Sequence, residues 1–176
     1  MFWVSIQGMK VIGIDPGSVH LGWGIIEVDS GMKIRGVQFG VLHAKPKDTF
    51  YQRLFHLSSQ LSQILCDHEP QVAVIERIFL GKNVDSAFKL GHIRGMCAVE
   101  CQGRGLEIQE YAARTVKKQI TGSGNSDKLT VQNFLSQQLR VQLNNETFDA
   151  SDALALALCH VLNHSVQQRI IRMEVR

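Results

Sequence analysis

Two carboxylates stand three residues apart at the start of an apolar stretch. Asp149 and Asp152 are followed directly by a run of alanine and leucine over residues 153–158, a composition that favours a buried helix. On a helix this spacing places both carboxylates on one face, with Cβ atoms roughly 5–6 Å apart. Carboxylates are rarely buried without a partner, so a cation is expected beside them. The alternative is a solvated first turn, where acids complement the helix dipole.

Two further acids follow short apolar segments that predict strands. Asp15 ends one such segment and Glu76 ends another. In open α/β sheets functional groups gather at the carboxyl ends of strands, so neighbouring strands would bring these two carboxylates to the same place as the helical pair. Taken singly, Asp15 before a proline suits a turn, and Glu76 suits a surface position at a strand end. In combination the four acids predict one acidic site.

Four carboxylates in one place raise one another's pKa unless a cation compensates. Mg²⁺ and Mn²⁺ prefer oxygen ligands, and two such ions about 3.5–4 Å apart form an arrangement used for phosphodiester cleavage. One ion activates a water as the nucleophile, and the other stabilises the leaving oxygen. We therefore predict Mg²⁺, with Mn²⁺ able to replace it, at two ions per active site. The predicted catalytic and metal-binding residues are Asp15, Glu76, Asp149 and Asp152.

The elements that position these acids predict a mixed α/β domain. Strands are expected at residues 10–15, 23–28, 33–42, 71–75 and 106–109. Helices are expected at residues 49–66, 86–102, 127–139 and from 149 onwards. The first three strands form an antiparallel meander through the turn signal at residues 29–31. Three antiparallel strands followed by alternating strands and helices predict a five-stranded mixed sheet flanked by helices.

Length and composition fit a single soluble domain. The chain has 176 residues, of which 44% are hydrophobic and 20% charged, and no apolar run approaches the ~20 residues of a membrane span. The apolar start lacks the charged leader of a secretory signal, so we expect a cytoplasmic protein. Residues 1–9 are expected to be an extension or the start of the first strand, residues 10–165 the catalytic domain, and residues 166–176 a basic tail.

The cysteines and the basic residues further limit the functions that the sequence allows. The four cysteines, Cys66, Cys97, Cys101 and Cys159, show no disulfide spacing. Cys97 and Cys101 could form half a metal site, but no second pair accompanies them, and all four cysteines are expected to be reduced core residues. The formal net charge is +3, and the bases gather in clusters. Such clusters are either solvated faces or the mark of a polyanionic partner. His160 lies about 16 Å along the helix from Asp149, so a structural role is expected for it.

From about residue 10 to about residue 164 the chain resembles the RuvC-type Holliday junction resolvases. The matching motifs appear in the same order: Gly13-Ile-Asp-Pro-Gly-Ser18, Ile75-Glu76, Phe79, Lys82-Asn83-x-Asp85-Ser-Ala87, Glu110-Tyr-Ala-Ala-Arg114 with Val116-Lys117, and Asp149-Ala-x-Asp-Ala-Leu-Ala155. They are specific in combination, whereas Gly-Ile-Asp-x-Gly alone is not.

The resemblance implies a ribonuclease H-like fold and a homodimer that nicks a four-way DNA junction symmetrically and leaves 5′-phosphate ends. It also implies the four acids as catalytic residues and a branch-migration motor as partner. The implied DNA-binding residues are Phe79, Lys82, Asn83, Arg114, Lys117 and Lys128. A loop aromatic beside a catalytic acid suits base stacking, worth about 1–3 kcal/mol, and core packing of Phe79 is the alternative. The glycine-containing helix 86–102 suits either a dimer seam or monomer packing.

Three other functions stay open on the sequence. The segment Ile14-Asp-Pro-Gly-Ser18 also resembles the phosphate loop of actin-like phosphotransferases, which close a second domain over a nucleotide. A chain of 176 residues leaves little room for that domain. A ribonuclease H-like nuclease acting on structured RNA would use the same acids. A junction-binding module without activity is the third alternative, and the intact acids argue against it.

Overall fold

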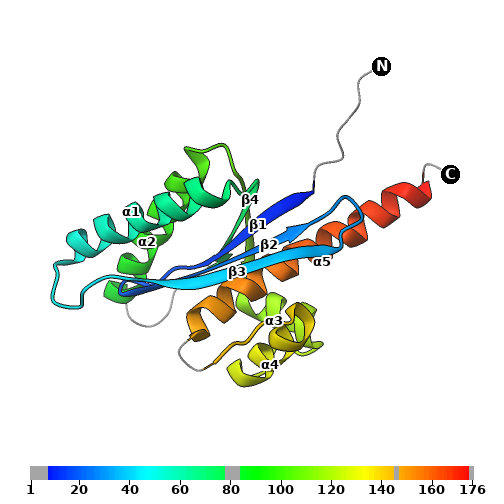
Figure 1. The fold of residues 1–176 in the computed structure, drawn as a ribbon. Helices are drawn as coiled ribbons and strands as arrows, with labels where there is room; N and C mark the ends of the chain where they lie inside the picture. Colours follow the sequence, from blue (N-terminus) through cyan, green and yellow to red (C-terminus); the bar gives the residue numbers. More distant parts are fainter. Residues whose placement is uncertain (1–7, 78–83, 145–146, 175–176) are drawn as a thin grey trace, which may run out of the picture.

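The computed structural model describes residues 8–77, 84–144 and 147–174, with side chains described up to residue 167. It contains one five-stranded sheet in the order β3-β2-β1-β4-β5 (Figure 1). The strands are β1 (Met9–Asp15), β2 (His20–Val28), β3 (Ile34–His43), β4 (Val72–Arg77) and β5 (Glu107–Ala112). β1, β2 and β3 are antiparallel neighbours, whereas β4 and β5 run parallel to β1. The predicted mixed sheet is therefore confirmed.

Helices cover both faces of this sheet. One face carries α1 (Phe50–His68) and α2 (Val84–Gln102), and the other carries α3 (Ala113–Thr121), α4 (Lys128–Leu139) and α5 (Phe148–Glu174) (Figure 1). Within the described residues no helix is long and apolar enough to cross a membrane.

The two central strands are buried on both sides because helices cover both faces. In β1, Val11 packs toward α5 while Ile12 and Ile14 pack toward α1 and α2. In β4, Val74 and Ile75 are divided in the same way. A continuous apolar strand is the expected signature of this position. Each fully buried aliphatic side chain contributes about 1.5–3 kcal/mol, so these strands are held firmly.

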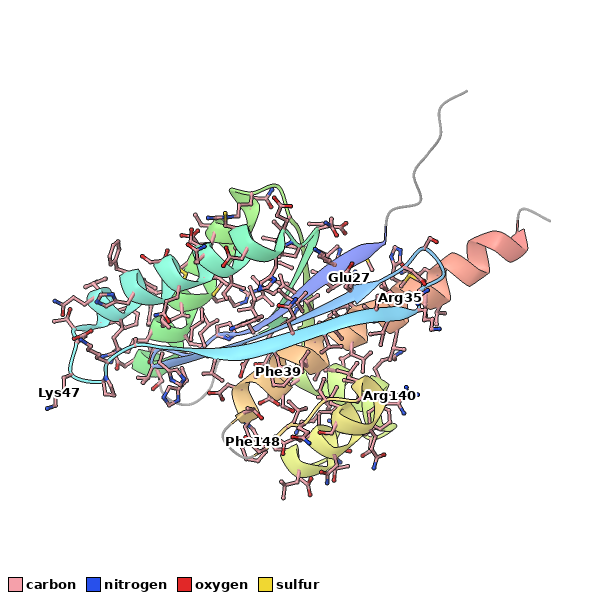
Figure 2. All side chains as sticks on the ribbon, in the orientation of Figure 1. Glu27, Arg35, Phe39, Lys47, Arg140 and Phe148 are labelled. Atoms are coloured by element: carbon pink, nitrogen blue, oxygen red, sulfur yellow. The ribbon has the colours of Figure 1, made fainter. Side chains whose placement is uncertain are left out.

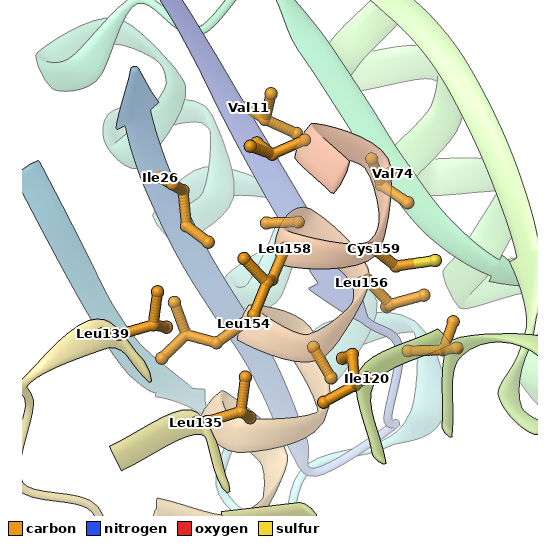
Figure 3. Packing of buried hydrophobic residues seen from close by; sticks show 14 of the residues in the cluster. Val11, Ile26, Val74, Ile120, Leu135, Leu139, Leu154, Leu156, Leu158 and Cys159 are labelled. Atoms are coloured by element: carbon orange, nitrogen blue, oxygen red, sulfur yellow. The ribbon is translucent and has the colours of Figure 1, made fainter. Parts of the chain in front are cut away.

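The apolar run of α5 forms the centre of one core. Leu154, Leu156 and Leu158 of α5 pack between the sheet and the helices α3 and α4 (Figure 3). Val11 and Val74 approach from the strands, and all of these side chains are almost fully buried. The run therefore anchors α5 as a rigid support for the acids at its first turn.

The boundaries differ from expectation in three places. Helix α3 was not predicted, because β5 continues to Ala112 and passes directly into the helix without a glycine, a proline or a side-chain cap. Strand β2 begins at His20, earlier than expected. Helix α5 continues to Glu174, so the expected boundary at residue 165 falls inside a helix. Thr49 is the N-cap of α1, and its hydroxyl accepts a hydrogen bond from the backbone N–H of Gln52.

Candidate active site

The first two acids lie at one edge of the sheet because their strands are parallel neighbours. Ile14 of β1 is the ladder partner of Ile75 of β4, so Asp15 and Glu76 follow directly at the carboxyl ends of adjacent strands. Both side chains line the same cavity. The inference from strand ends is therefore correct about their placement.

Two glycines bring the first turn of α5 onto these strand ends. Gly22 of β2 is the ladder partner of Asp15, and a Cβ atom on Gly22 would lie 2.0 Å from the carbonyl oxygen of Asp149. A Cβ atom on Gly13 would lie 1.9 Å from the carbonyl oxygen of Ala153. Any side chain at either position would push the helix away from the sheet. Glycine at both sites allows the close approach that carries the helical acids to Asp15.

The resulting cavity has a volume of about 280 Å³. Its polar wall holds acids and lysines, and its remaining wall is apolar. The lining residues are Asp15, Glu76, Asp152, Lys117, Lys128, Ala113, Val116, Val131, Ala155 and Leu156. Three of the four predicted acids thus share one cavity with two of the predicted DNA-binding lysines.

The charges of the acids are coupled. The pKa of Asp15 is raised to about 7, chiefly by burial. The negative charges of the other carboxylates add to this rise, with Asp152 contributing most, followed by Glu76 and Asp149. The pKa of Glu76 is raised by burial and then by Asp152. Since mutual repulsion requires proximity, the four acids form one electrostatic site.

Lys128 provides a positive charge inside this site. Its Nζ lies 2.9 Å from Oδ2 of Asp152, and this contact raises the pKa of Lys128. The residue is the first of α4, whose start is fixed by Asp127: the Asp127 carboxylate accepts a hydrogen bond from the backbone N–H of Thr130 at 2.7 Å. The N-cap therefore determines where the lysine lies.

Asp149 faces a different neighbour. Its Oδ2 lies 3.8 Å from Nδ1 of His20, and it is not among the residues that line the cavity. His20 opens β2, across the sheet from Glu76. Sequence reasoning missed this histidine. The available signal was its position two residues after Ser18, at the end of the turn that follows Asp15.

The other two predicted DNA-binding residues within the described ranges, Lys117 and Arg114, lie on α3, and Lys117 lines the cavity. Nζ of Lys117 donates a hydrogen bond to the carbonyl oxygen of Ser126 at 2.8 Å, which ties the loop 121–126 to α3. Arg114 is exposed, and the same loop packs on its stem: a Cβ atom on Gly124 would lie 2.6 Å from Cγ of Arg114. Both cations therefore border a loop that the structure holds against α3.

The donor chemistry of the four acids fits a hard divalent cation. They are carboxylates only, they repel one another, and the Lys128 ammonium lies where a cation would neutralise Asp152. In the part of the chain that the structure describes, no three acidic, histidine or cysteine side chains are grouped as a ready-made metal site. Instead, Asp152 contacts Lys128, and Oδ2 of Asp149 lies 3.8 Å from Nδ1 of His20.

Several expectations concern residues outside the cavity. His160 is buried, and its Nδ1 lies 3.1 Å from the hydroxyl of Tyr111, in agreement with a structural role. Cys97, Cys101 and Cys159 are buried, as expected of core thiols, and burial raises the pKa of Cys101 to about 12. The expectation is wrong for Cys66, which is exposed. Phe79, Lys82 and Asn83, predicted to bind DNA, lie outside the described residues.

A mixed sheet in this order, with acids at the ends of β1 and β4 and at the start of α5, defines the class as ribonuclease H-like nucleases. Comparison with known proteins gives the family. The model of the family described as crossover junction endodeoxyribonuclease RuvC matches residues 11–160. The RuvC of Bdellovibrio bacteriovorus is 44% identical to this chain and covers 88% of it, with 90% of the relative matched. The RuvC of Sorangium cellulosum is 39% identical to this chain and covers 87% of it, with 84% of the relative matched.

Solved structures agree with this assignment. T. thermophilus RuvC in complex with a Holliday junction substrate is 26% identical, with a TM-score of 0.81 over 90% of this chain and 96% of that one. The yeast mitochondrial Holliday junction resolvase Ydc2, at 12% identity and a TM-score of 0.65, covers 97% of this chain and 85% of its own and shares the fold. The chain belongs to the RuvC family of crossover junction endodeoxyribonucleases. The motif-based identification is confirmed, and the RNA-cleaving and phosphotransferase alternatives are not favoured.

Proposed function

We propose that the enzyme resolves four-way (Holliday) DNA junctions by paired symmetric nicks that leave 5′-phosphate ends, in recombination and DNA repair. The observation that supports this best is the coupling of four carboxylates, three of which line one cavity together with two lysines. Acids of this density suit a divalent cation, and the lysines suit the phosphate groups of DNA. The structure of the T. thermophilus relative in complex with a Holliday junction substrate supports the same substrate here.

The four acids are proposed to hold two Mg²⁺ ions, which Mn²⁺ can replace. When bound, the ions lower the pKa of an attacking water and stabilise the charge that develops on the leaving oxygen. Asp15 and Glu76 contribute from rigid strand ends, and Asp149 and Asp152 contribute from the first turn of α5. Asp152 must exchange its contact with Lys128 for a ligand contact. The Lys128 ammonium group is then free to form an ion pair with a substrate phosphate in the cavity.

DNA contacts are proposed on the α3 and α4 side of the cavity. Lys117 and Lys128 hold backbone phosphates near the acids, and Arg114 extends this contact along α3. Lys82 and Asn83 are proposed to contact DNA as well. Phe79 follows Glu76 closely in the chain, so we propose that its ring stacks on bases at the opened centre of the junction.

The active unit is proposed to be a homodimer, because paired nicks on a two-fold junction require two sites related by a two-fold axis. The proposed seam is one face of α2, formed by Val84, Phe88, Gly91, Gly95 and Val99. The three apolar side chains are exposed, and nothing lies within 4 Å of a Cβ atom placed on either glycine. Two such helices could therefore approach closely. The expectation that these glycines serve packing inside the monomer gains no support from this geometry.

Three further parts of the proposal concern context. We place the enzyme in the cytoplasm, where its DNA substrate lies, and we propose that a branch-migration motor delivers the junction to it. Residues 10–165 are proposed as the nuclease unit. Residues 1–9 are proposed to be an N-terminal extension or the start of the first strand, and residues 166–176 a basic tail, which up to Glu174 continues α5.

The test is to incubate the protein with Mg²⁺ and a synthetic four-way junction and to map the nicks on all four strands. Paired nicks at symmetric positions support a resolvase, and scattered nicks on one strand contradict it. Asp152→Asn should abolish nicking while leaving junction binding intact, because the substitution removes a ligand charge and keeps the shape. Phe79→Ala should lower turnover more than binding. Appreciable Mg²⁺-dependent cleavage by Asp152→Asn would falsify the assignment of the site.

A further inference from the structure

A second group of DNA-binding side chains lies on the opposite side of the acids from Lys117 and Lys128. We propose that His20, His43, Lys45 and Lys47 form a phosphate-binding rim that holds the cleaved DNA strand as it leaves the acidic site. This inference rests on the proposed function, since it assigns the second half of the DNA path across the same site. We call these four residues the β3 rim.

The order of the strands separates the two cationic groups. Glu76 lies on the β4 side of Asp15. Lys117 and Lys128 line the same cavity as Glu76, and their charges oppose the rise of its pKa. His20 and His43 lie on the β2 and β3 side. The acids therefore occupy the space between two groups of potential phosphate partners. A strand whose scissile phosphate lies over the acids must continue past both of them.

The rim is continuous with the active site. His20 lies 3.8 Å from Asp149 through Nδ1 and Oδ2. His20 and His43 are ladder partners at the ends of β2 and β3, and their ring centroids are 5.0 Å apart. All four rim side chains are exposed. Figure 2 shows Lys47 projecting from the loop between β3 and α1, beyond the ends of the strands.

The rim is also rigidly built. The backbone N–H of Ala44 donates to the carbonyl oxygen of Val19 at 2.8 Å. Arg53 joins the two loops: its Nε donates to the carbonyl oxygen of Ser18 at 2.9 Å, and its Nη1 donates to the carbonyl oxygen of Asp48 at 2.8 Å. The loop that follows catalytic Asp15 is thus fastened to the loop that carries Lys45 and Lys47. This arrangement fixes the lysines relative to the acids.

The chemistry of the rim suits phosphates. Lysine ammonium groups neutralise phosphate charge, and imidazole N–H groups donate hydrogen bonds to phosphate oxygens. The acid of the connecting loop, Asp48, is turned away from this role because its carboxylate lies 3.7 Å from Nε2 of His56. The rim consequently presents hydrogen-bond donors and positive charge beside the acids. A polyanion requires both, whereas a neutral ligand does not require the charge.

The test is a salt titration of junction binding, carried out with the full chain in EDTA so that no cleavage occurs. The slope of log K against log salt concentration is negative, and each lost phosphate contact makes it shallower by about 0.9 for duplex DNA. We expect Lys45→Gln with Lys47→Gln to make the slope shallower by roughly two and to weaken binding at least tenfold in 50 mM salt. Lys33→Gln, which removes an exposed lysine before the other end of β3, is the matched control and should leave the slope unchanged.

The histidines are tested separately. His20→Gln should weaken binding in EDTA by about three- to tenfold, a readout that a role limited to orienting Asp149 would not change. If the double lysine variant keeps the wild-type slope, or if Lys33→Gln changes it equally, the rim is wrong. If wild-type protein shows no preference for a four-way junction over linear duplex, the proposed function itself fails. The two failures are therefore distinguishable.

Discussion

The ammonium group of Lys128 and the carboxylate of Asp152 form an ion pair 2.9 Å long at the centre of the acidic cavity. The charge of the same lysine partly offsets the rise that burial causes in the pKa of Glu76 and of Asp15. Lys128 therefore acts as the counter-ion of the acid cluster before any metal binds. If Asp152 holds a metal as proposed, the metal and this lysine compete for the same carboxylate, and metal binding frees the lysine for the proposed DNA contact.

Replacing Lys128 by methionine should separate these two roles. The substitution keeps the length of the side chain and removes the charge, so a metal no longer displaces an ammonium group from Asp152. We expect Mn²⁺ to bind the DNA-free protein about three- to tenfold more tightly, measured by electron paramagnetic resonance of the free ion. Junction cleavage should fall by at least tenfold, because the phosphate contact is lost. Lys118→Met, an exposed neighbour of Lys117, serves as control; unchanged Mn²⁺ affinity in Lys128→Met would exclude the competition.

The raised pKa of Asp15 predicts how the metal-free protein responds to pH. The folded pKa is about 7, and the unfolded value is about 3.9. Between these values the folded state holds a proton that the unfolded state has released, so stability falls as the pH rises through this window and levels off above about pH 7. Asp15→Asn removes the effect. Its melting temperature should exceed that of wild type by roughly 3–8 °C at pH 8, and the difference should disappear near pH 4.

Thermal unfolding in EDTA at a series of pH values measures this difference. Comparison of the two proteins at each pH cancels the contributions of the other titrating groups. Added Mg²⁺ should stabilise wild type more than Asp15→Asn and so reduce the difference at pH 8. A melting difference that stays constant from pH 4 to pH 8 would contradict the raised pKa.

The placement of the acids was predictable because it follows from topology. Asp15 and Glu76 each end a buried strand, and parallel neighbours place such ends at one edge. The partners of the helical acids were not predictable. Lys128 and His20 lie 24 and 129 residues away in sequence from Asp152 and Asp149, and only the packing of α4 and β2 brings them together. No local pattern in the sequence encodes such pairs.

Helix α3 was missed for a local reason. A helix start is recognised from a capping side chain or a turn residue, and Ala112 provides neither: the chain passes from an extended residue into the helix without a side-chain hydrogen bond. The helix forms because Val116 and Ile120 are buried against the core that α5 shares. Helix α3 is therefore stabilised by tertiary packing, which cannot be recognised from a short polar sequence.

The close packing of α5 on β2 gives a steric prediction. A Cβ atom on Gly22 would lie 2.0 Å from the carbonyl oxygen of Asp149, so Gly22→Ala must displace the first turn of the helix. A shift of about 1 Å in a catalytic group can cost about 100-fold in rate, and we expect a loss of this order in nicking, with junction binding retained. Gly36→Ala is the control, since its Cβ atom would find only ordinary contacts with Glu27 at 3.6–3.7 Å. Equal activity of the two variants would show that the close packing is not required.

The exposed face of α2 predicts how the proposed dimer can be broken. A Cβ atom on Gly95 meets nothing within 4 Å in the monomer, so Gly95→Arg should fold normally while its bulk and charge block a second copy of α2. We expect light scattering after gel filtration to give a monomer of about 19.7 kDa, where wild type gives twice that mass. Leu129→Glu, which changes an exposed apolar residue on α4, should remain dimeric. Paired nicking should become uncoordinated in Gly95→Arg, because each site then cuts alone, whereas a dimeric Gly95→Arg would place the seam elsewhere.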